Sequence, residues 1–285
     1  MEHAPFVDSH LHFWDRATFD YPWLTDPVHP LPARYLPADI DGRKPEAVVF
    51  VQADCLDSQG VAEAEWAAAH VRAIGADGAV VAFAPAEDLR RLPGHLERLA
   101  AVAAVTGVRR LLQDEPEDLL RSPELAAGLR RIADAGLAFD ACVRHHQLPA
   151  LVVLRRAAPD GELVLDHLGK PPVRDGWGSD AAQRWYATIR VLAAEPRTTV
   201  KLSGLAPEAA PGPLLEQVRP FVLAALDVFG ADRCMAGSDF PVSAAPPDAV
   251  GYSTWFEFIG GLAGSAEERD ALLRGTARGV YRMPA

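Results

Sequence analysis

The chain has 285 residues, of which 49% are hydrophobic and 24% charged, and its formal net charge at pH 7 is −11. This composition is typical of a globular protein and leaves ample material for a core. The negative charge and the scattered Lys and Arg residues exclude an extended basic surface for nucleic acid. No stretch approaches the roughly 18 apolar residues of a membrane span, and the first residues lack a signal-peptide pattern. We therefore expect a soluble protein with neither nucleic-acid nor membrane partners.

Eight short apolar or β-branched runs recur along the chain, and most end in a polar residue or are followed directly by one. They are residues 6–12, 47–54, 79–84, 107–112, 138–143, 162–166, 199–202 and 234–236. Longer stretches between them carry apolar residues at three- and four-residue spacing, which predicts amphipathic helices over 62–74, 123–135, 181–194 and 214–229. Alternation of strand and helix favours a parallel sheet covered by helices.

Residues at the predicted helix ends support both boundaries of the helix at 123–135 and predict the start of one further helix after Ser265. Ser122 is placed to cap a helix with Pro123 at its first position, and Gly136 follows the last turn. Ser265 and Glu268 have capping-box spacing. The pattern predicts an α/β fold, a single (β/α)8 TIM barrel over residues 1–285, because such barrels typically occupy about 250 residues.

The segment 13–46 replaces the helix expected after the first strand. It is rich in Pro, Asp and aromatic residues, and we interpret it as a long lid-like loop over the barrel mouth. Its Trp14, Tyr21 and Trp23 favour an ordered loop. Cys55, Cys142 and Cys234 stand far apart with no CxxC pair, which argues against disulfides and a structural zinc site and favours a cytoplasmic location.

His10 and His12 are one residue apart in the first predicted strand, so their side chains leave the same face while Leu11 points away. Two imidazoles that converge at a strand end can bind one metal ion or polarise one carbonyl. For an isolated HxH pattern, a chance pair of hydrogen-bonded histidines is the better explanation. His167 and Asp239 also come directly after predicted strands, and barrel enzymes carry their catalytic groups at the C-terminal ends of different strands. Asp239 could instead cap a helix, but Pro241 weakens that alternative.

Five segments together resemble the lactonase group of the amidohydrolase superfamily: DSHLHFWD, GVRRLLQDEP, LDHLGKPP, VKLSGL and GSDFPV. This group of (β/α)8 barrels includes hydrolases of fucono- and rhamnonolactone. The resemblance places the family's catalytic and metal-ligating positions on His10, His12, His167 and Asp239. Binuclear members have a metal-bridging lysine after the fourth strand, where this chain has Arg109 and Arg110. We therefore expect at most one divalent ion per chain, zinc or manganese, and whether it is required stays open.

Other side chains near strand ends are candidates for substrate binding. They are Arg109, Gln113, Arg144, His145, His146 and Lys201, joined by Trp14 and Trp23 as an apolar wall over a sugar ring. Arg109 and Lys201 rank highest, since an inward-facing cation needs a reason to be buried. Salt bridges or a solvated rim would also explain the cations, His145 or His146 could ligate a metal, and packing within the lid would explain the tryptophans.

The resemblance implies a hydrolase that opens a small sugar-derived lactone. Asp239 would take a proton from the attacking water and return it to the leaving oxygen. The three imidazoles, with or without a divalent ion, would stabilise the oxyanion. Two alternatives are a metal-dependent decarboxylase of the same superfamily and a barrel that binds a sugar acid without turning it over. Assembly into a homo-oligomer is left open.

Overall fold

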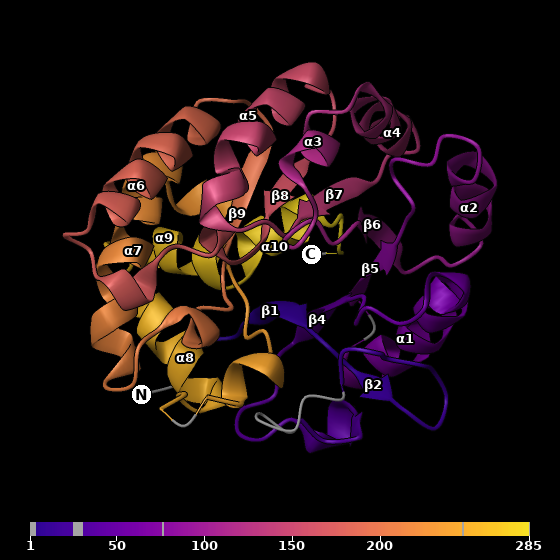
Figure 1. Ribbon diagram of the computed structural model, residues 1–285. Coiled ribbons are helices and arrows are strands. Elements are labelled where there is room, and N and C mark those ends of the chain that lie inside the picture. Colours follow the sequence, from indigo (N-terminus) through magenta and orange to yellow (C-terminus); the bar gives the residue numbers. More distant parts are fainter. Residues whose placement is uncertain (1–3, 25–30, 76, 247, 285) are drawn as a thin grey trace.

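The computed structural model describes residues 4–24, 31–75, 77–246 and 248–284. Eight parallel strands form one sheet whose order follows the chain, and this sheet curls into a nearly closed barrel (Figure 1). The strands are β1 (Val7–Leu11), β4 (Ala47–Val51), β5 (Ala79–Phe83), β6 (Val105–Arg109), β7 (Ala138–Ala141), β8 (Leu163–Leu165), β9 (Thr198–Leu202) and β10 (Cys234–Ala236). Six of the eight predicted runs contain a whole strand, and the runs 107–112 and 199–202 overlap β6 and β9, so the predicted barrel is confirmed.

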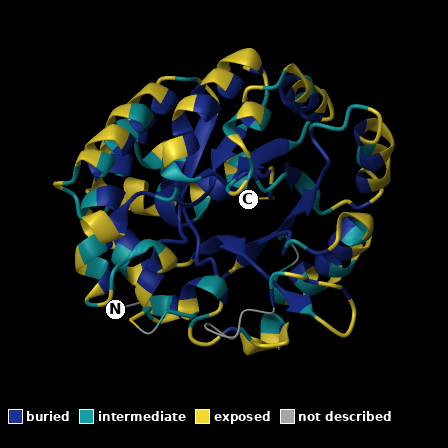
Figure 2. Ribbon diagram, in the orientation of Figure 1, coloured by how far each residue is buried: buried dark blue, intermediate teal, exposed yellow. Residues whose placement is uncertain are grey.

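Helices surround this barrel and cover its outer face. They are α1 (Gly60–Ile74), α2 (Leu92–Leu99), α3 (Glu117–Leu120), α4 (Pro123–Asp134), α5 (Leu148–Ala157), α6 (Asp180–Ala193), α7 (Leu214–Phe229), α8 (Tyr252–Gly260), α9 (Ala266–Asp270) and α10 (Thr276–Val280). The four predicted amphipathic helices are confirmed as α1, α4, α6 and α7. Figure 2 shows that the strands are buried and that the exposed residues lie on the outward sides of the helices.

The predicted helix caps are present. Ser122 Oγ accepts a hydrogen bond from Leu125 N at 3.1 Å, and Gly136 follows α4 with a φ of +75°. Ser265 Oγ accepts from Glu268 N at 3.1 Å at the start of α9. These bonds satisfy backbone N–H groups that a helix leaves unpaired in its first turn. None of the helices in the described ranges has both the length and the apolar character needed to cross a bilayer.

The barrel interior has an apolar floor. Val49, Val81, Val164 and Met235 from four strands form one buried cluster with residues of the C-terminal segment, including Tyr281. Alternate strand residues such as Val48 and Phe50 belong instead to the larger core between strands and helices. The floor seals one end of the barrel, so polar groups gather toward the other end, where the strands finish.

The predicted lid contains a small antiparallel pair, β2 (Trp14–Asp15) with β3 (Arg34–Tyr35). Trp14 is fully buried, and its indole N–H donates to Pro32 O at 2.7 Å. Trp23 is half-buried and donates to Ala53 O at 2.7 Å, which ties the lid to the segment after β4. Residues 25–30 of the predicted lid lie outside the described residues.

Candidate active site

A bulge in β1 positions the histidine pair. The register against β4 shifts between Asp8 and Leu11, so the strand contains an extra residue there. Such bulges re-aim side chains at barrel rims. Asp8 holds the bulge, because its buried carboxylate accepts from His10 N at 3.1 Å and Ser238 N at 2.9 Å. His10 therefore faces the barrel interior while Leu11 packs outward.

Backbone bonds bring the end of β10 alongside the end of β1. Asp239 N donates to His10 O at 2.7 Å, and His12 N donates to Phe240 O at 3.0 Å. Asp239 itself has a φ of +56°, a left-handed conformation that is uncommon for a residue with a side chain. This bend directs its carboxylate toward the two histidines.

His167 reaches the same place from β8 through a second unusual backbone. Its φ is +54°, and Leu168 after it has a φ of +55°. Gly204, after β9, makes room for the imidazole, because a Cβ at that position would lie 2.1 Å from His167 Nδ1. Residues held in sparsely populated conformations cluster at functional sites, where the surrounding structure supports the strain.

The four predicted residues converge at the C-terminal ends of their strands. His10 Nε2 lies 3.2 Å from His12 Nε2, and Asp239 Oδ1 lies 3.4 Å from His12 Nε2, 3.7 Å from His10 Nε2 and 3.8 Å from His167 Nε2. His10 is fully buried, whereas His12, His167 and Asp239 retain 4–6% of their surface. The structure thus brings together three ring nitrogens and one carboxylate oxygen that solvent reaches from one side.

The remaining polar atoms of these side chains have partners that fix their orientation. His12 Nδ1 lies 2.8 Å from Val51 O, so it must carry the ring proton of the neutral imidazole. His167 Nδ1 lies 3.0 Å from Ser203 Oγ. Ser243 Oγ donates to Asp239 Oδ2 at 2.8 Å, which leaves Oδ1 for the site.

The donor set fits one divalent cation. Tetrahedral ligands at about 2.0–2.1 Å from zinc are about 3.3 Å apart, close to the separations of the four converging atoms. His10, His12 and Asp239 form one such group. A second group joins His10 to Asp166 and His167, but the Asp166 carboxylate is already paired with Lys201 and Arg109. The residues therefore favour a single ion over two.

Burial and mutual proximity set the charge state of the site. Burial lowers the pKa of His167 to about 4 and holds the pKa of His10 well below its usual range. These two imidazoles are accordingly neutral at pH 7. Burial would raise the pKa of Asp239, but His167 and the two other imidazoles hold it well below the usual range of a carboxyl. The carboxylate is therefore ionised and available as a proton acceptor.

Below the histidines lies a layer of buried charge. Lys201 Nζ is 2.5 Å from Asp140 Oδ2 and 3.2 Å from Asp166 Oδ1. Arg109 donates to Gln52 O at 2.6 Å and lies 3.4 Å from Asp166 Oδ2. The substrate contact predicted for Lys201 does not fit its placement, because its side chain is 0% exposed and paired beneath the site. Arg109 is nearly as deeply buried.

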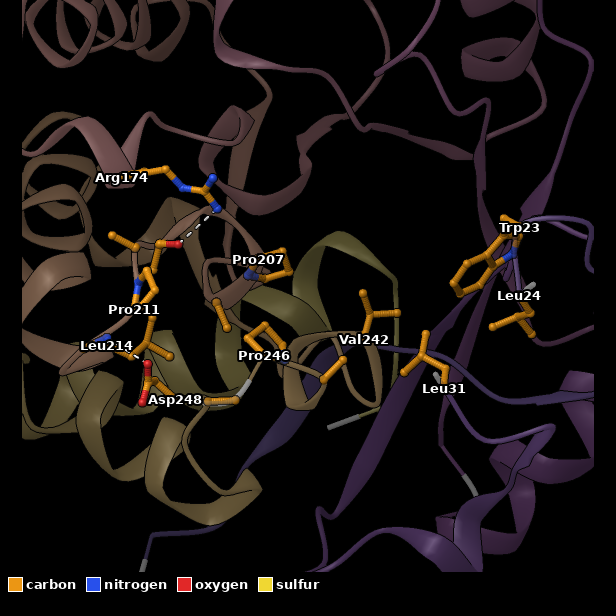
Figure 3. Close-up of a pocket in the computed structure, with 16 residues that line it drawn as sticks. Trp23, Leu24, Leu31, Arg174, Pro207, Pro211, Leu214, Val242, Pro246 and Asp248 are labelled. Atoms are coloured by element: carbon orange, nitrogen blue, oxygen red, sulfur yellow. Dashed lines mark hydrogen bonds between the residues drawn. The ribbon is translucent and has the colours of Figure 1, made fainter. Parts of the chain in front are cut away.

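A groove of about 650 Å³ lies at the barrel mouth between the lid and the loops that follow β9 and β10 (Figure 3). Trp23, Leu31, Val242 and Pro207 give it a largely apolar wall, and Arg174 and Asp248 add charged groups. Trp23 lines this groove, and its role as a substrate contact stays a prediction. Trp14 does not line it, because its fully buried ring packs inside the lid.

Four other predicted contacts lie after β6 and β7. Arg144 pairs with Asp114 at 2.8 Å, and Gln113 Oε1 accepts from Cys142 Sγ. His145 Nδ1 lies 3.1 Å from Lys170 O, and His146 is exposed. None of the four lines the groove within the part of the chain that the structure describes. Their roles as substrate contacts stay predictions.

A (β/α)8 barrel with three histidines and an aspartate at its C-terminal rim defines a class of hydrolytic enzymes that act on carbonyl centres. Residues 7–283 match the amidohydrolase family, and the chain belongs to it. It is 32% identical to an L-fucono-1,5-lactonase of Burkholderia ambifaria, covering 87% of this chain and 84% of the relative. It is 33% identical to an L-fucono-1,5-lactonase of Burkholderia multivorans, covering 98% and 96%. The predicted family resemblance is confirmed.

Solved structures agree in fold. A crystal structure of an amidohydrolase from Burkholderia multivorans with bound zinc is 32% identical, with a TM-score of 0.84 over 99% of this chain and 100% of that one. A 2,6-dihydroxybenzoate decarboxylase from Rhizobium has a TM-score of 0.61 over 98% of this chain and 99% of that one, at 14% identity. That likeness extends to the fold alone.

We expect no more than one tightly held metal ion per chain. The four converging ligands can hold one ion, and position 109 in β6 is an arginine, which cannot bridge a second. Elemental analysis of dialysed protein would measure the metal content. Two equivalents of zinc or manganese that survive dialysis would contradict the single-ion site.

Proposed function

We propose that the protein is a lactonase that opens a lactone ring by attack of water on the carbonyl carbon. The observation that carries this proposal is the convergence of Asp239 Oδ1 with three imidazole Nε2 atoms on one accessible spot at the barrel rim. The L-fucono-1,5-lactonase names of two relatives at 32–33% identity support it.

The groups suit the steps of lactone hydrolysis. Asp239 takes a proton from water as the C–O bond forms, and the carbonyl oxygen becomes an oxyanion. His10 and His167 lie where hydrogen bonds to that oxyanion can form, whereas Nε2 of His12, whose ring proton is on Nδ1, can only accept. Collapse of the tetrahedral species breaks the ring C–O bond, and Asp239 returns the proton to the leaving alkoxide. A divalent cation bound by the same four residues would polarise the carbonyl and lower the pKa of water.

The groove and the relatives together point to a sugar-derived lactone with an apolar edge. The catalytic atoms are polar, while Trp23, Leu31 and Val242 offer apolar surface in the groove at the barrel mouth. The methyl group of a 6-deoxysugar lactone would match that wall. L-fucono-1,5-lactone is such a compound, and it is the substrate in the printed names of the relatives.

We expect kcat/KM for L-fucono-1,5-lactone to exceed that for unsubstituted δ-valerolactone by about 10²-fold or more, because sites that hydrogen-bond hydroxyls discriminate strongly against analogues that lack them. A pH-indicator assay corrected for spontaneous ring opening would measure both. L-galactono-1,5-lactone, which differs by one hydroxyl at C6, is the matched control for the apolar wall and should react more slowly than the deoxy compound. Carbon dioxide release from a hydroxybenzoate without lactone turnover would replace the lactonase with the decarboxylase.

A further inference from the structure

The Lys201 ammonium is surrounded by three groups in the barrel interior. Its Nζ lies 2.5 Å from Asp140 Oδ2, 3.2 Å from Asp166 Oδ1 and 3.3 Å from Nδ1 of His10. The side chains of Lys201, Asp140 and Asp166 are all 0% exposed. An ammonium has three N–H donors and no acceptor, so it can only donate to these neighbours.

A neutral imidazole carries its proton on one of two nitrogens, and this geometry separates the two tautomers of His10. With the proton on Nδ1, a ring N–H would face the ammonium at 3.3 Å, and two donors would oppose each other. Asp166 Oδ1 lies 3.2 Å from both Nδ1 and the Lys201 ammonium, and among the described residues neither group is aligned with it for a hydrogen bond. With the proton on Nε2, Nδ1 accepts from the ammonium and the conflict disappears.

We propose that Lys201 is a positioning residue that holds His10 as the tautomer with its proton on Nε2. The proposal concerns a residue of the candidate site, and it rests on the proposed function only for the use made of that proton. Nε2 of His10, the ring nitrogen that faces the other site residues, then carries the N–H donor.

The neighbouring contacts complete a hydrogen-bonded chain. His12 Nδ1 donates to Val51 O at 2.8 Å, so His12 Nε2 has a lone pair. His10 Nε2 lies 3.2 Å from that lone pair and can donate to it. Each hydrogen bond in this chain therefore has one direction. The Lys201 ammonium donates to His10, His10 donates to His12, and His12 donates to the Val51 carbonyl.

This tautomer opposes metal binding at His10. A cation is ligated by the lone pair of an imidazole nitrogen, and its ligand histidines donate their other ring N–H to a carboxylate or carbonyl. At His10 such a state needs the proton on Nδ1, donated to Asp166, against the adjacent Lys201 ammonium. Removing the ammonium should release His10 to adopt the ligating tautomer. We therefore expect Lys201 to weaken the affinity of this site for zinc.

Nitrogen NMR of the metal-free protein tests the tautomer directly. Selective ¹⁵N labelling of the nine histidines, with long-range ¹H–¹⁵N correlation at pH 7, distinguishes protonated from bare ring nitrogens. A His10→Gln variant assigns the His10 signals. A proton on Nε2 with bare Nδ1 is the expected result, and a proton on Nδ1 overturns the proposal.

Zinc titration by calorimetry tests the consequence. We expect the double variant Lys201→Met with Asp140→Asn, which removes both partners of the buried pair, to bind zinc about 10-fold or more tighter than the parent. The direction follows from the tautomer, and the size is that of the roughly 10- to 100-fold losses that mutation of supporting groups behind a metal ligand typically causes. Tyr281→Phe is the matched control, because Tyr281 donates to Asp140 at 2.9 Å but the variant keeps the ammonium beside His10. Its affinity should equal that of the parent.

Equal or weaker zinc binding by the folded double variant overturns the metal consequence. If the double variant fails to fold, the nitrogen NMR of the parent still decides the tautomer. Neither measurement involves lactone turnover, so loss of the lactonase assignment would leave both results interpretable.

Discussion

Replacing Asp239 with asparagine is expected to lower kcat by about 10²- to 10⁴-fold, the usual contribution of a general base. The amide is nearly isosteric with the carboxylate but cannot accept the proton of water. Ser243 Oγ can still donate to the amide oxygen, as it now donates to Oδ2, so the side chain should keep its orientation. Folding should therefore be retained.

Lactone hydrolysis by the purified variant, measured with a pH indicator, would give kcat, and circular dichroism would verify the fold. Asp227→Asn is a suitable control, because it makes the same chemical change on α7, where Asp227 accepts a hydrogen bond from Tyr186 at the surface. The control should keep parental activity. An Asp239→Asn enzyme within a few-fold of the parent would show that the base lies elsewhere, and His145 and His146 would then be the next candidates.

The sequence was sufficient for the barrel because the strands carry a local signal. Runs such as AVVFV and AVVAF are short and rich in β-branched residues, and each became a strand within the predicted limits. Helix α5 was not predicted, since LPALVVLRRA is apolar over most of its length, and periodicity alone does not distinguish a short apolar helix from a buried strand. Tertiary packing, which buries six of its residues, decides that segment.

The four converging residues were also predictable, because each lies within three residues of the C-terminal end of a strand and parallel strands end at one rim. The buried charged groups that support these residues could not be predicted in the same way. Asp140 and Asp166 are far from Lys201 in sequence, and only barrel closure places their strands around one ammonium. A signal was present, however: a lysine and two aspartates within or next to buried strands imply partners for one another. The β1 bulge that aims His10 has no comparable sequence pattern.

The same interior placement leads to a large expected effect on stability. We expect Lys201→Met to lower the free energy of unfolding at pH 7 by about 3–5 kcal/mol, as is typical when one partner of a buried ion pair is removed. Met fills a similar volume, so the effect comes from charge: Asp140 and Asp166 lose their shared ammonium in a site that water does not reach. Urea unfolding monitored by circular dichroism would measure the difference.

The pH dependence of this deficit identifies its cause. Burial already raises the pKa of Asp140 to about 6 although Lys201 opposes the shift, and without the ammonium the pKa should rise further. The folded variant then binds a proton that the unfolded chain, with a carboxyl pKa of about 3.9, does not bind. Its stability must therefore increase as pH falls through the raised pKa, and the deficit relative to the parent should be smaller at pH 5 than at pH 7.

The Lys201→Met, Asp140→Asn double variant, which lacks the isolated carboxylate, should recover part of the loss at pH 7 and show less of this pH dependence. A deficit that stays constant between pH 5 and pH 7 would assign the loss to packing and not to unpaired charge.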